Sequence, residues 1–220
     1  MQKIGELVLY KNNQLIALNK PNAVGVQADK TKDKALIDLA EIYTSSKLHL
    51  IHRIDRPASG VVVFAKNKKA VAALNEQVRE RKVKKTYLAI VGQAPPRKEG
   101  ELVHYLRKNG RTNRSEAFEE EQAGSKKAVL RYRLLGSSER YHLLEIDLVT
   151  GRHHQIRAQL GAIGCPIRGD EKYGFRRANR DRSIQLHAWK IQFQHPVSQE
   201  SVLLTAPPPE EAVWQAFDIQ

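Results

Sequence analysis

The sequence is dominated by short apolar runs that hairpin-length turns separate. Runs of this length suit β-strands, because a strand needs about four to eight residues whereas a helix needs roughly ten or more. The runs lie at residues 7–10, 15–20, 61–65, 84–91, 129–135, 141–149, 185–193 and 202–205. They outnumber the segments with helical spacing. The sequence therefore predicts an α+β fold with a mixed, largely antiparallel β-sheet and flanking helices.

Apolar residues at helical spacing predict a few helices between these strands. We expect the first over residues 33–43, with Asp33 as its N-cap. A second should begin directly after Asn67, which is also a residue type that caps helices. A third helix is expected to open at Thr150, and a short helix over residues 208–217 closes the predicted fold.

The charge of the chain points to its partner. The chain carries 37 Lys and Arg residues against 24 Asp and Glu, a formal net charge of +13. A basic protein of this size binds nucleic acid more often than an anionic membrane surface. Residues 97–125, basic first and then acidic, are expected to form an exposed arm or hairpin, and residues 176–182 a basic loop. Nucleic acid is therefore the first partner to test.

The lengths of the apolar runs and the cysteine content indicate in which compartment of the cell the protein is expected. No apolar run approaches the length of a membrane span, and the N-terminus has no apolar segment typical of a signal peptide. Cys165 is the one cysteine, which excludes an internal disulfide and a cysteine-rich zinc site. We expect a soluble cytoplasmic protein that is monomeric and does not bind membranes.

Residues 52–60, HRIDRPASG, place Asp55 between Arg53 and Arg56 just before an apolar strand. An Asp in such a position is usually one half of a surface ion pair at a turn. The functional alternative is a carboxylate that a nearby guanidinium keeps ionised, and such a group is a ready nucleophile or base. Both interpretations stay open on this stretch alone.

Residues 149–160, VTGRHHQIRAQL, carry a second candidate. Arg157 lies at the edge of the core-facing side of the expected helix, and His153, four residues earlier, shares that side. A partly buried Arg needs an anionic partner, which is either a structural carboxylate or Asp55. Arg152, at the expected helix start, suits a phosphate.

Two further features have a structural and a functional interpretation. The pair His153 and His154 invites a metal site, but adjacent helix residues point to different sides and no acidic cluster accompanies them. Tyr87, within KKTYLAIV at residues 84–91, is a packing residue by default. Close to a nucleophile, its ring could instead stack on a base that has left its helix.

Taken together, these stretches resemble the RNA pseudouridine synthases, and specifically the RluA branch of that family. Residues 52–60 resemble the HRLD–x–x–TSG signature, residues 84–91 the second motif, and residues 150–160 the TGR–x–HQIR–x–H motif. GDEKYG at residues 169–174 and the later LHAW…F…HP stretch resemble further blocks. The blocks occur in family order over roughly residues 15 to 206.

The resemblance implies a role for each matching residue. Asp55 would be the catalytic nucleophile, Tyr87 would pack against the target base, and Arg157 would pair with Asp55 and keep it ionised. Arg53 would enter the RNA stack beside the gap left by the flipped uridine, and Leu186 would line the base pocket. Further RNA contacts are expected from His52, Arg152, His154, Arg176, Arg177, Arg180 and Arg182.

The resemblance also implies an isomerase that converts specific uridines of ribosomal or transfer RNA to pseudouridine without a cofactor or a metal. Whether the carboxylate attacks carbon or removes a sugar proton stays open. Residues 1–220 would form a single catalytic domain, without the small S4-type RNA-binding domain that many relatives carry ahead of it. Ile54 replaces the usual Leu, Ala58 the usual Thr and Gln159 the usual His; the last two departures bear on RNA positioning.

Three other functions compete with this one. A factor of the same fold could bind RNA or assist ribosome assembly without catalysis, although the intact Asp55, Tyr87 and Arg157 argue against it. A glycosidase-like hydrolase would need a second acid facing Asp55, for which Asp147 and Glu145 are the candidates. A ribonuclease that relies on histidine could use His153, His154 and His187.

Overall fold

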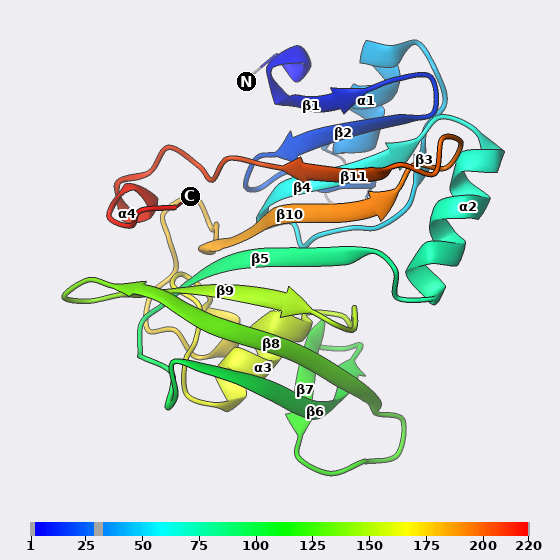
Figure 1. Ribbon diagram of the computed structural model, residues 1–220. Helices are drawn as coiled ribbons and strands as arrows, with labels where there is room; N and C mark the ends of the chain where they lie inside the picture. The colour runs from blue at the N-terminus through cyan, green and yellow to red at the C-terminus, as the bar shows by residue number, and fades with distance from the viewer. Residues whose placement is uncertain (1–2, 29–32, 220) are drawn as a thin grey trace. The chain divides into compact units, whose positions relative to one another are not determined.

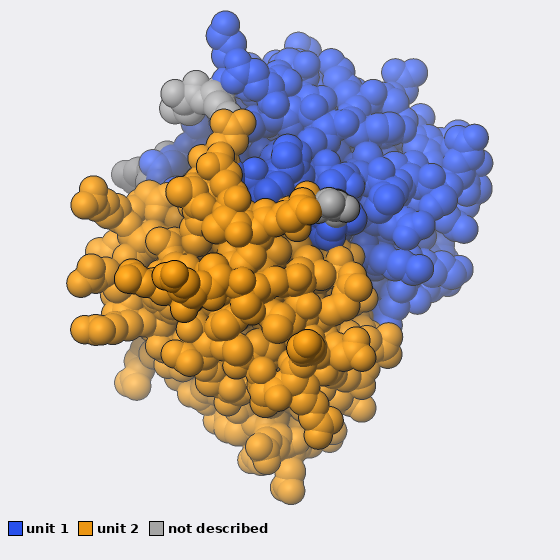
Figure 2. Space-filling model, turned by 60° about the vertical axis from the view of Figure 1, so that its left-hand side comes forward, with its two compact units in different colours: residues 1–85, 187–209 blue, residues 86–186, 210–220 orange. Residues whose placement is uncertain are grey.

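The computed structural model of the protein describes residues 3–28 and 33–219. The chain divides into two compact units, shown in different colours in Figure 2. Unit 1 comprises Met1–Lys85 and His187–Pro209, and unit 2 comprises Thr86–Leu186 and Glu210–Gln220. The expectation of a single catalytic domain over residues 1–220 stays a prediction. Each unit is built around its own strands (Figure 1).

Unit 1 holds a mixed set of strands in the order β1-β2-β4-β10, with β3 beside β4 and β11 beside β10. Their bounds are β1 Val8–Lys11, β2 Leu15–Lys20, β3 His49–Leu50, β4 Ser59–Ala65, β10 Leu186–Gln194 and β11 Ser201–Thr205. β4 and β10 run parallel, and the other pairings of this unit are antiparallel. The 3-10 turn η1 (Ile4–Leu7) and the helices α1 (Leu36–Thr44) and α2 (Lys68–Arg79) complete the unit.

The helices of unit 1 begin where their caps allow. Asn67 caps α2 as predicted, because its side chain accepts a hydrogen bond from the Ala70 amide at 2.9 Å. The predicted N-cap Asp33 is wrong. α1 begins after Ala35, whose amide donates to the Asp38 carboxylate at 2.9 Å. Asp33 instead forms an ion pair with Arg56, 2.5 Å away.

β4 and β10 approach each other unusually closely. Gly60, in β4, lies opposite Ala188 of β10 and has a φ of +115°, which only glycine adopts without strain. A Cβ atom at Gly60 would lie 2.2 Å from the Ala188 carbonyl oxygen. Next to it, the buried His187 ring bonds to Ser59 Oγ at 2.8 Å and to the Ala206 carbonyl at 2.9 Å. These contacts fix the chain directly after residues 52–58.

Unit 2 holds an antiparallel sheet in the order β5-β9-β8-β6-β7. Its strands are β5 Lys84–Val91, β6 Glu99–Asn109, β7 Arg114–Phe118, β8 Lys126–Ser137 and β9 His142–Leu148. The helix α3 (Gln155–Ala162) packs against β6 and β7, as Figure 1 shows. The 3-10 turn η2 (Glu171–Tyr173) and the short helix α4 (Ala212–Gln215) follow. Both units confirm the predicted mixed, mostly antiparallel sheet with helices.

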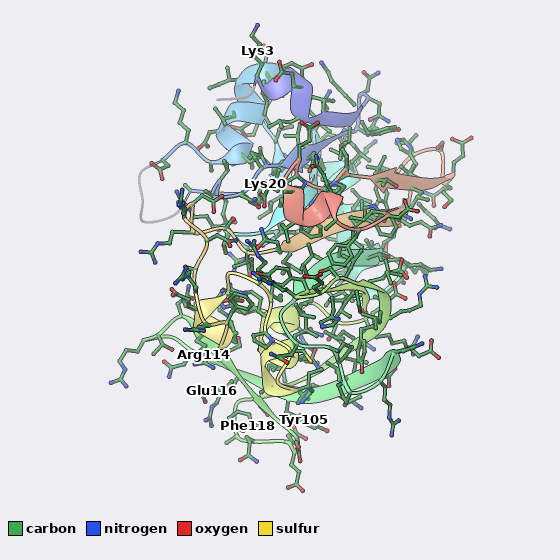
Figure 3. The ribbon with its side chains drawn as sticks, turned by 90° about the vertical axis from the view of Figure 1, so that its left-hand side faces the viewer. Lys3, Lys20, Tyr105, Arg114, Glu116 and Phe118 are labelled. Atoms are coloured by element: carbon green, nitrogen blue, oxygen red, sulfur yellow. The ribbon has the colours of Figure 1, made fainter. Side chains whose placement is uncertain are left out.

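The charged stretch at residues 97–125, expected to be an exposed arm or a hairpin, forms the hairpin β6–β7. β6 also pairs with β8 over Glu99–Leu106, so most of this stretch is an integral part of the sheet rather than a detached arm. Figure 3 shows the hairpin with Tyr105, Arg114, Glu116 and Phe118 labelled. Among the described residues, no helix is both long and apolar enough to cross a membrane.

Candidate active site

Asp55 lies in the half-buried loop between β3 and β4. The buried side chains of Ile54 and Ala58 anchor the loop on either side of it, and the Ala58 amide donates to the Asp55 carbonyl at 3.1 Å. Arg53 is exposed, whereas Arg56 forms its ion pair with Asp33. The loop therefore contains the surface ion pair that is usual at such a turn, but Arg56 makes it with Asp33.

Lys20 is a buried residue that contacts this loop, and no sequence pattern indicated its role. Its side chain is 0% exposed, and Nζ donates to the carbonyls of Pro21 (2.9 Å), Val24 (2.8 Å) and Arg56 (3.1 Å). Burial lowers the pKa of Lys20 from 10.5 to about 7, an effect that the Asp55 charge opposes and the Arg56 charge reinforces. Lys20 thus holds the backbone next to Asp55 and interacts electrostatically with the Asp55 carboxylate. Figure 3 labels it.

Replacing Lys20 by Met should destabilise unit 1 by about 1–3 kcal/mol at pH 7, because three partly buried carbonyls lose their donor. The folded-state pKa of about 7 lies below the ordinary value of 10.5, so the unfolded chain binds this proton more tightly. The stability contributed by Lys20 is therefore lowest below pH 7 and rises between pH 7 and 10.5. Urea unfolding of both proteins at pH 7 and pH 9 measures this.

Met at Lys66 provides the matched control, because Lys66 Nζ donates to one carbonyl, that of Asn12, at 2.6 Å. The gap in unfolding free energy between the wild type and Lys20→Met should widen at pH 9. A gap that narrows as the pH rises would contradict this account of Lys20.

His52, predicted as an RNA contact, forms an internal hydrogen bond. Its Nε2 accepts from the Val63 amide at 3.2 Å, and its Nδ1 is buried. Burial, with the positive charge of Lys85, lowers the pKa of His52 to about 3. The ring is therefore neutral at physiological pH, and the RNA contact predicted for it would not involve a cation.

Arg157 forms a buried ion pair with Asp170 in unit 2. Nε and Nη2 donate to the two carboxylate oxygens at 2.6 Å and 2.9 Å, and the side chains are 6% and 1% exposed. This fork geometry is the one in which Arg binds a carboxylate most strongly. The structural carboxylate that the sequence analysis allowed for is thus Asp170, within GDEKYG. Asp55 belongs to unit 1 and Arg157 to unit 2, and the pairing expected between them stays a prediction.

The turn before α3 departs from the prediction. α3 begins at Gln155 rather than Thr150, and His154 precedes it with a φ of +52°. His153 therefore lies outside the helix, and the expectation that it shares a helix side with Arg157 is wrong. The Gln155 side chain holds the turn, because it accepts from the Thr150 hydroxyl (2.8 Å) and the Arg152 amide (3.0 Å). Its amide donates to the Val129 carbonyl at 3.0 Å.

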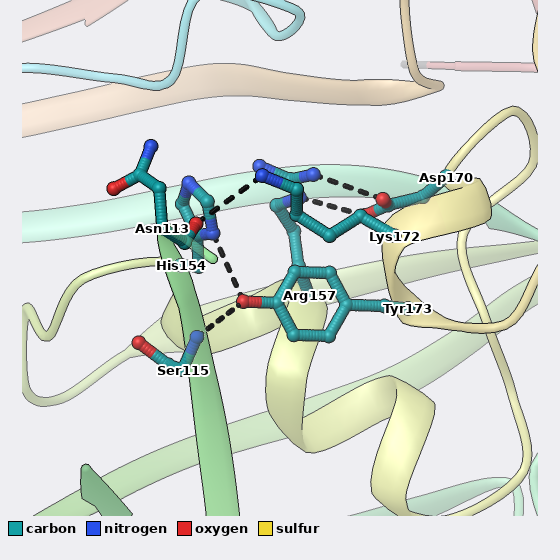
Figure 4. A network of polar contacts seen from close by, with 7 residues as sticks. All are labelled: Asn113, Ser115, His154, Arg157, Asp170, Lys172 and Tyr173. Atoms are coloured by element: carbon teal, nitrogen blue, oxygen red, sulfur yellow. Dashed lines mark hydrogen bonds and ion pairs between the residues drawn. The ribbon is translucent and has the colours of Figure 1, made fainter. Parts of the chain in front are cut away.

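Tyr173 connects three segments of unit 2, as Figure 4 shows. Its hydroxyl accepts from the Ser115 amide at 2.8 Å and bonds to His154 Nδ1 at 2.9 Å. The neighbouring Lys172 Nζ donates to the Asn113 carbonyl at 3.3 Å. The turn at residues 169–174 is therefore tied both to the hairpin β6–β7 and to the start of α3. The structure places His154 in this network, together with Arg157.

The remaining predicted residues differ in exposure. Tyr87, opposite Ile146 in the β5–β9 pair, and Leu186 are buried. Arg152 is exposed, and its Nε donates to the Lys127 carbonyl at 3.0 Å. All three departures from the family motifs, Ile54, Ala58 and Gln159, are buried. The Gln159 amide donates to the Leu102 carbonyl of β6 at 3.0 Å, so this departure affects the packing of α3.

The basic loop at residues 176–182 exposes all four of its arginines, and hydrogen bonds within it and to the residues that follow hold it in place. The exposed residues are Arg176, Arg177, Arg180 and Arg182. Asn179 Nδ2 donates to the Ser183 carbonyl (2.9 Å) and to Gln185 Oε1 (2.8 Å). Asp181 accepts from the Ser183 amide and hydroxyl at 3.0 Å and 2.6 Å. The loop is therefore preorganised, and its cations point outward.

The residues that a hydrolase or a ribonuclease mechanism would need are engaged in other interactions. Glu145 forms an ion pair with Arg133 at 2.9 Å, and Asp147 accepts from the Thr86 hydroxyl at 3.3 Å. Neither is a poised second acid for a hydrolase. His187 is 0% exposed with both ring nitrogens bonded, which removes it from a ribonuclease site. Within residues 3–28 and 33–219, no cluster of three His, Cys, Asp or Glu residues is arranged to hold a metal ion.

The comparisons with known proteins agree with one another. The family described as RNA pseudouridylate synthase matches residues 14–162. The uncharacterized RNA pseudouridine synthase YhcT of Bacillus subtilis is 32% identical over 94% of this chain and 70% of its own length. Ribosomal large subunit pseudouridine synthase C of Haemophilus ducreyi is 33% identical over 94% of this chain and 68% of its own length. The same enzyme of Buchnera aphidicola is 31% identical over 91% and 66%.

Two solved structures share the fold. Human RNA pseudouridylate synthase domain containing 4 has a TM-score of 0.77 at 24% identity, over 94% of this chain and 90% of that one. Human RNA pseudouridylate synthase domain containing 1 has a TM-score of 0.78 at 23% identity, over 95% and 86%. At these identities the likeness establishes the fold.

Proposed function

Because the chain belongs to the RNA pseudouridylate synthase family, in its RluA branch, we propose that Asp55 is the catalytic carboxylate of this enzyme. The enzyme is an isomerase that converts uridine to pseudouridine in RNA. The reaction breaks the bond between a uracil nitrogen and the ribose and joins the same two groups through a uracil carbon. One ring proton moves from carbon to nitrogen, so the reaction is balanced without an oxidant or a reductant.

The observation that carries the role of Asp55 is the anchoring of its loop. Ile54 and Ala58 are buried on either side of it, and Lys20 Nζ binds the Arg56 carbonyl at 3.1 Å. A group that must meet one atom of a flipped nucleotide benefits from such fixed placement. The buried Lys20 side chain also interacts electrostatically with the Asp55 carboxylate.

The other roles follow from burial and charge. Tyr87 is buried with an aromatic ring that can stack on the uracil, and stacking offsets part of the cost of removing a base from its helix, about a few kcal/mol. Arg157 would stabilise the ionised Asp55, and its carboxylate partner Asp170 would keep the guanidinium in place. The exposed Arg53 would fill the gap left by the flipped uridine, and the half-buried His154 and the exposed Arg152 would contact the RNA.

The proposed substrate is ribosomal RNA. Two of the relatives described above are named as synthases of the large ribosomal subunit, and the net charge of +13 suits a large folded RNA. Mapping pseudouridine across all RNA of a strain that lacks this chain tests the proposal. We expect one or a few sites to be lost from large-subunit RNA. Loss from transfer RNA alone would overturn the substrate, and no loss at all would favour a factor that binds RNA without catalysis.

The basic loop should supply phosphate contacts. Changing Arg176, Arg177, Arg180 and Arg182 together to Gln removes four exposed cations. RNA binding should weaken, and the slope of log affinity against log salt should flatten by up to about 3.6, since each of four phosphate contacts contributes about 0.9. Titrations of one RNA at several salt concentrations measure both quantities.

The matched control changes the same number of exposed cations on or next to α2, which are Lys68, Lys69, Arg79 and Arg81. This control lowers the net charge by the same amount as the loop variant. It therefore distinguishes local phosphate contacts from the effect of the overall charge of the protein. If both quadruple variants weaken binding to the same extent, the loop is not a specific phosphate site.

A further inference from the structure

Tyr173 occupies the centre of the polar network in Figure 4. We propose that Tyr173 is a positioning residue of the active site, which fixes the Arg157 guanidinium and links it mechanically to the hairpin β6–β7. The proposal rests on the role proposed above for Arg157. It assigns a task to a residue that lies outside the catalytic set of Asp55, Tyr87 and Arg157.

The Tyr173 ring lies against two arginines. The guanidinium carbons of Arg157 and Arg114 are each 5.0 Å from the ring centre, within the range of a cation–π interaction. Arg157 comes from α3, whereas Arg114 begins β7 in the hairpin. Tyr173 itself is 4% exposed. Its ring therefore packs against a cation of the proposed active site and a cation of the hairpin.

The Tyr173 hydroxyl makes a second link between the same elements. It accepts from the Ser115 amide of β7 at 2.8 Å and is hydrogen-bonded to Nδ1 of His154, the residue that precedes α3, at 2.9 Å. Ser115 adds a parallel connection, because its hydroxyl donates to the His153 carbonyl at 2.6 Å. Two hydrogen-bonded paths, one through the Ser115 amide and one through its hydroxyl, thus join β7 to the start of α3.

RNA would act on this link at the hairpin, because the hairpin is basic and exposed. Its exposed cations are Arg107, Lys108, Arg111 and Arg114. Arg107 forms an ion pair with Glu116 at 3.1 Å. Lys172 Nζ donates to the carbonyls of Thr112 and Asn113 at the end of the hairpin. An RNA phosphate bound by Arg114 would change the contact between Arg114 and the Tyr173 ring. The network then carries that change to Arg157 without direct contact between RNA and Arg157.

The test separates the hydroxyl from the ring. Tyr173→Phe removes the two hydrogen bonds and keeps the ring, whereas Tyr173→Leu removes both. Tyr132→Phe is the matched control, because Tyr132 is buried in the same unit and bonds to the Arg97 backbone outside this network. For each protein, the single-turnover rate, the RNA affinity and the melting temperature are measured on one RNA that the wild type modifies.

We expect Tyr173→Phe to lower the rate about tenfold, the equivalent of one or two misdirected hydrogen bonds, with RNA affinity changed less than about twofold. Tyr173→Leu should lower the rate about a hundredfold, because Arg157 also loses its ring contact. Tyr132→Phe should lower the melting temperature about as much as Tyr173→Phe does and leave the rate unchanged. In an Arg157→Lys background, Tyr173→Phe should have a smaller effect than in the wild type, since the two residues then act through one another.

Two results would overturn the proposal. One is a wild-type rate for Tyr173→Phe, and the other is an equal loss of rate in Tyr132→Phe, which would reduce Tyr173 to general packing. These outcomes are distinct from a failure of the proposed function, which would appear as an inactive wild-type protein. Tyr173→Phe keeps the buried volume of the ring, so the test depends on that variant even if Tyr173→Leu does not fold.

Discussion

Asp55→Asn should lower the conversion of uridine to pseudouridine by at least about a thousandfold, as the loss of a central catalytic group commonly does. The amide has nearly the shape of the carboxylate but is neither an effective nucleophile nor a base at neutral pH. RNA affinity should change by less than about threefold, because phosphate contacts elsewhere supply most of it. The measurement is the extent of conversion over time, together with RNA binding, for the wild type and the variant.

Asp33→Asn is the matched control for this change. It also neutralises one carboxylate close to the loop, because Asp33 pairs with Arg56 at 2.5 Å. We expect it to keep the rate within about threefold, since exposed ion pairs contribute little. Residual activity of Asp55→Asn near the wild-type level would exclude Asp55 as the catalytic group, whatever the family motif implies.

Gly60→Ala should lower the free energy of unfolding by about 3 kcal/mol or more. Two costs combine at this position. The φ of +115° is unfavourable for any residue with a side chain, and the new Cβ would lie 2.2 Å from the Ala188 carbonyl oxygen, a backbone atom that cannot rotate away. Separation of β4 from β10 would also disturb the adjoining Asp55 loop. Urea unfolding measures the stability, and the uridine assay should show a parallel loss of activity.

Gly124→Ala separates the two costs. Gly124 has a φ of +75° with nothing within 4 Å of its Cβ position, so the variant carries backbone strain without a clash. Its loss should be about 1 kcal/mol. If Gly60→Ala costs no more than Gly124→Ala, the close approach of β4 and β10 does not constrain the fold.

The sequence was sufficient where local rules decide the structure. The continuous apolar run after residue 60 became β4, which is buried along its whole length. Asn67 caps α2 through its own side chain, a contact that spans three residues. The fold class and the family also followed from local patterns, since strand-length runs and motif blocks are read directly along the chain.

Prediction failed where a distant partner decides the structure. Thr150 looked like a helix start, but its hydroxyl accepts from the Val129 amide and its own amide donates to the Val129 carbonyl, so residues 150–154 precede the helix. Asp33 could not be both a cap and the partner of Arg56. Asp170 lies in GDEKYG, which resembles a family block, but no local pattern linked it to Arg157, and only the requirement of a buried Arg for an anion indicated that such a partner existed.

Lys20 has a consequence for the composition of the protein in solution. A pKa of about 7 means that, near neutrality, comparable numbers of molecules carry this interior charge and lack it. The protein is then a mixture of two electrostatic forms whose ratio changes tenfold for each pH unit. A kinetic trace recorded at one pH is therefore a weighted average of the two forms.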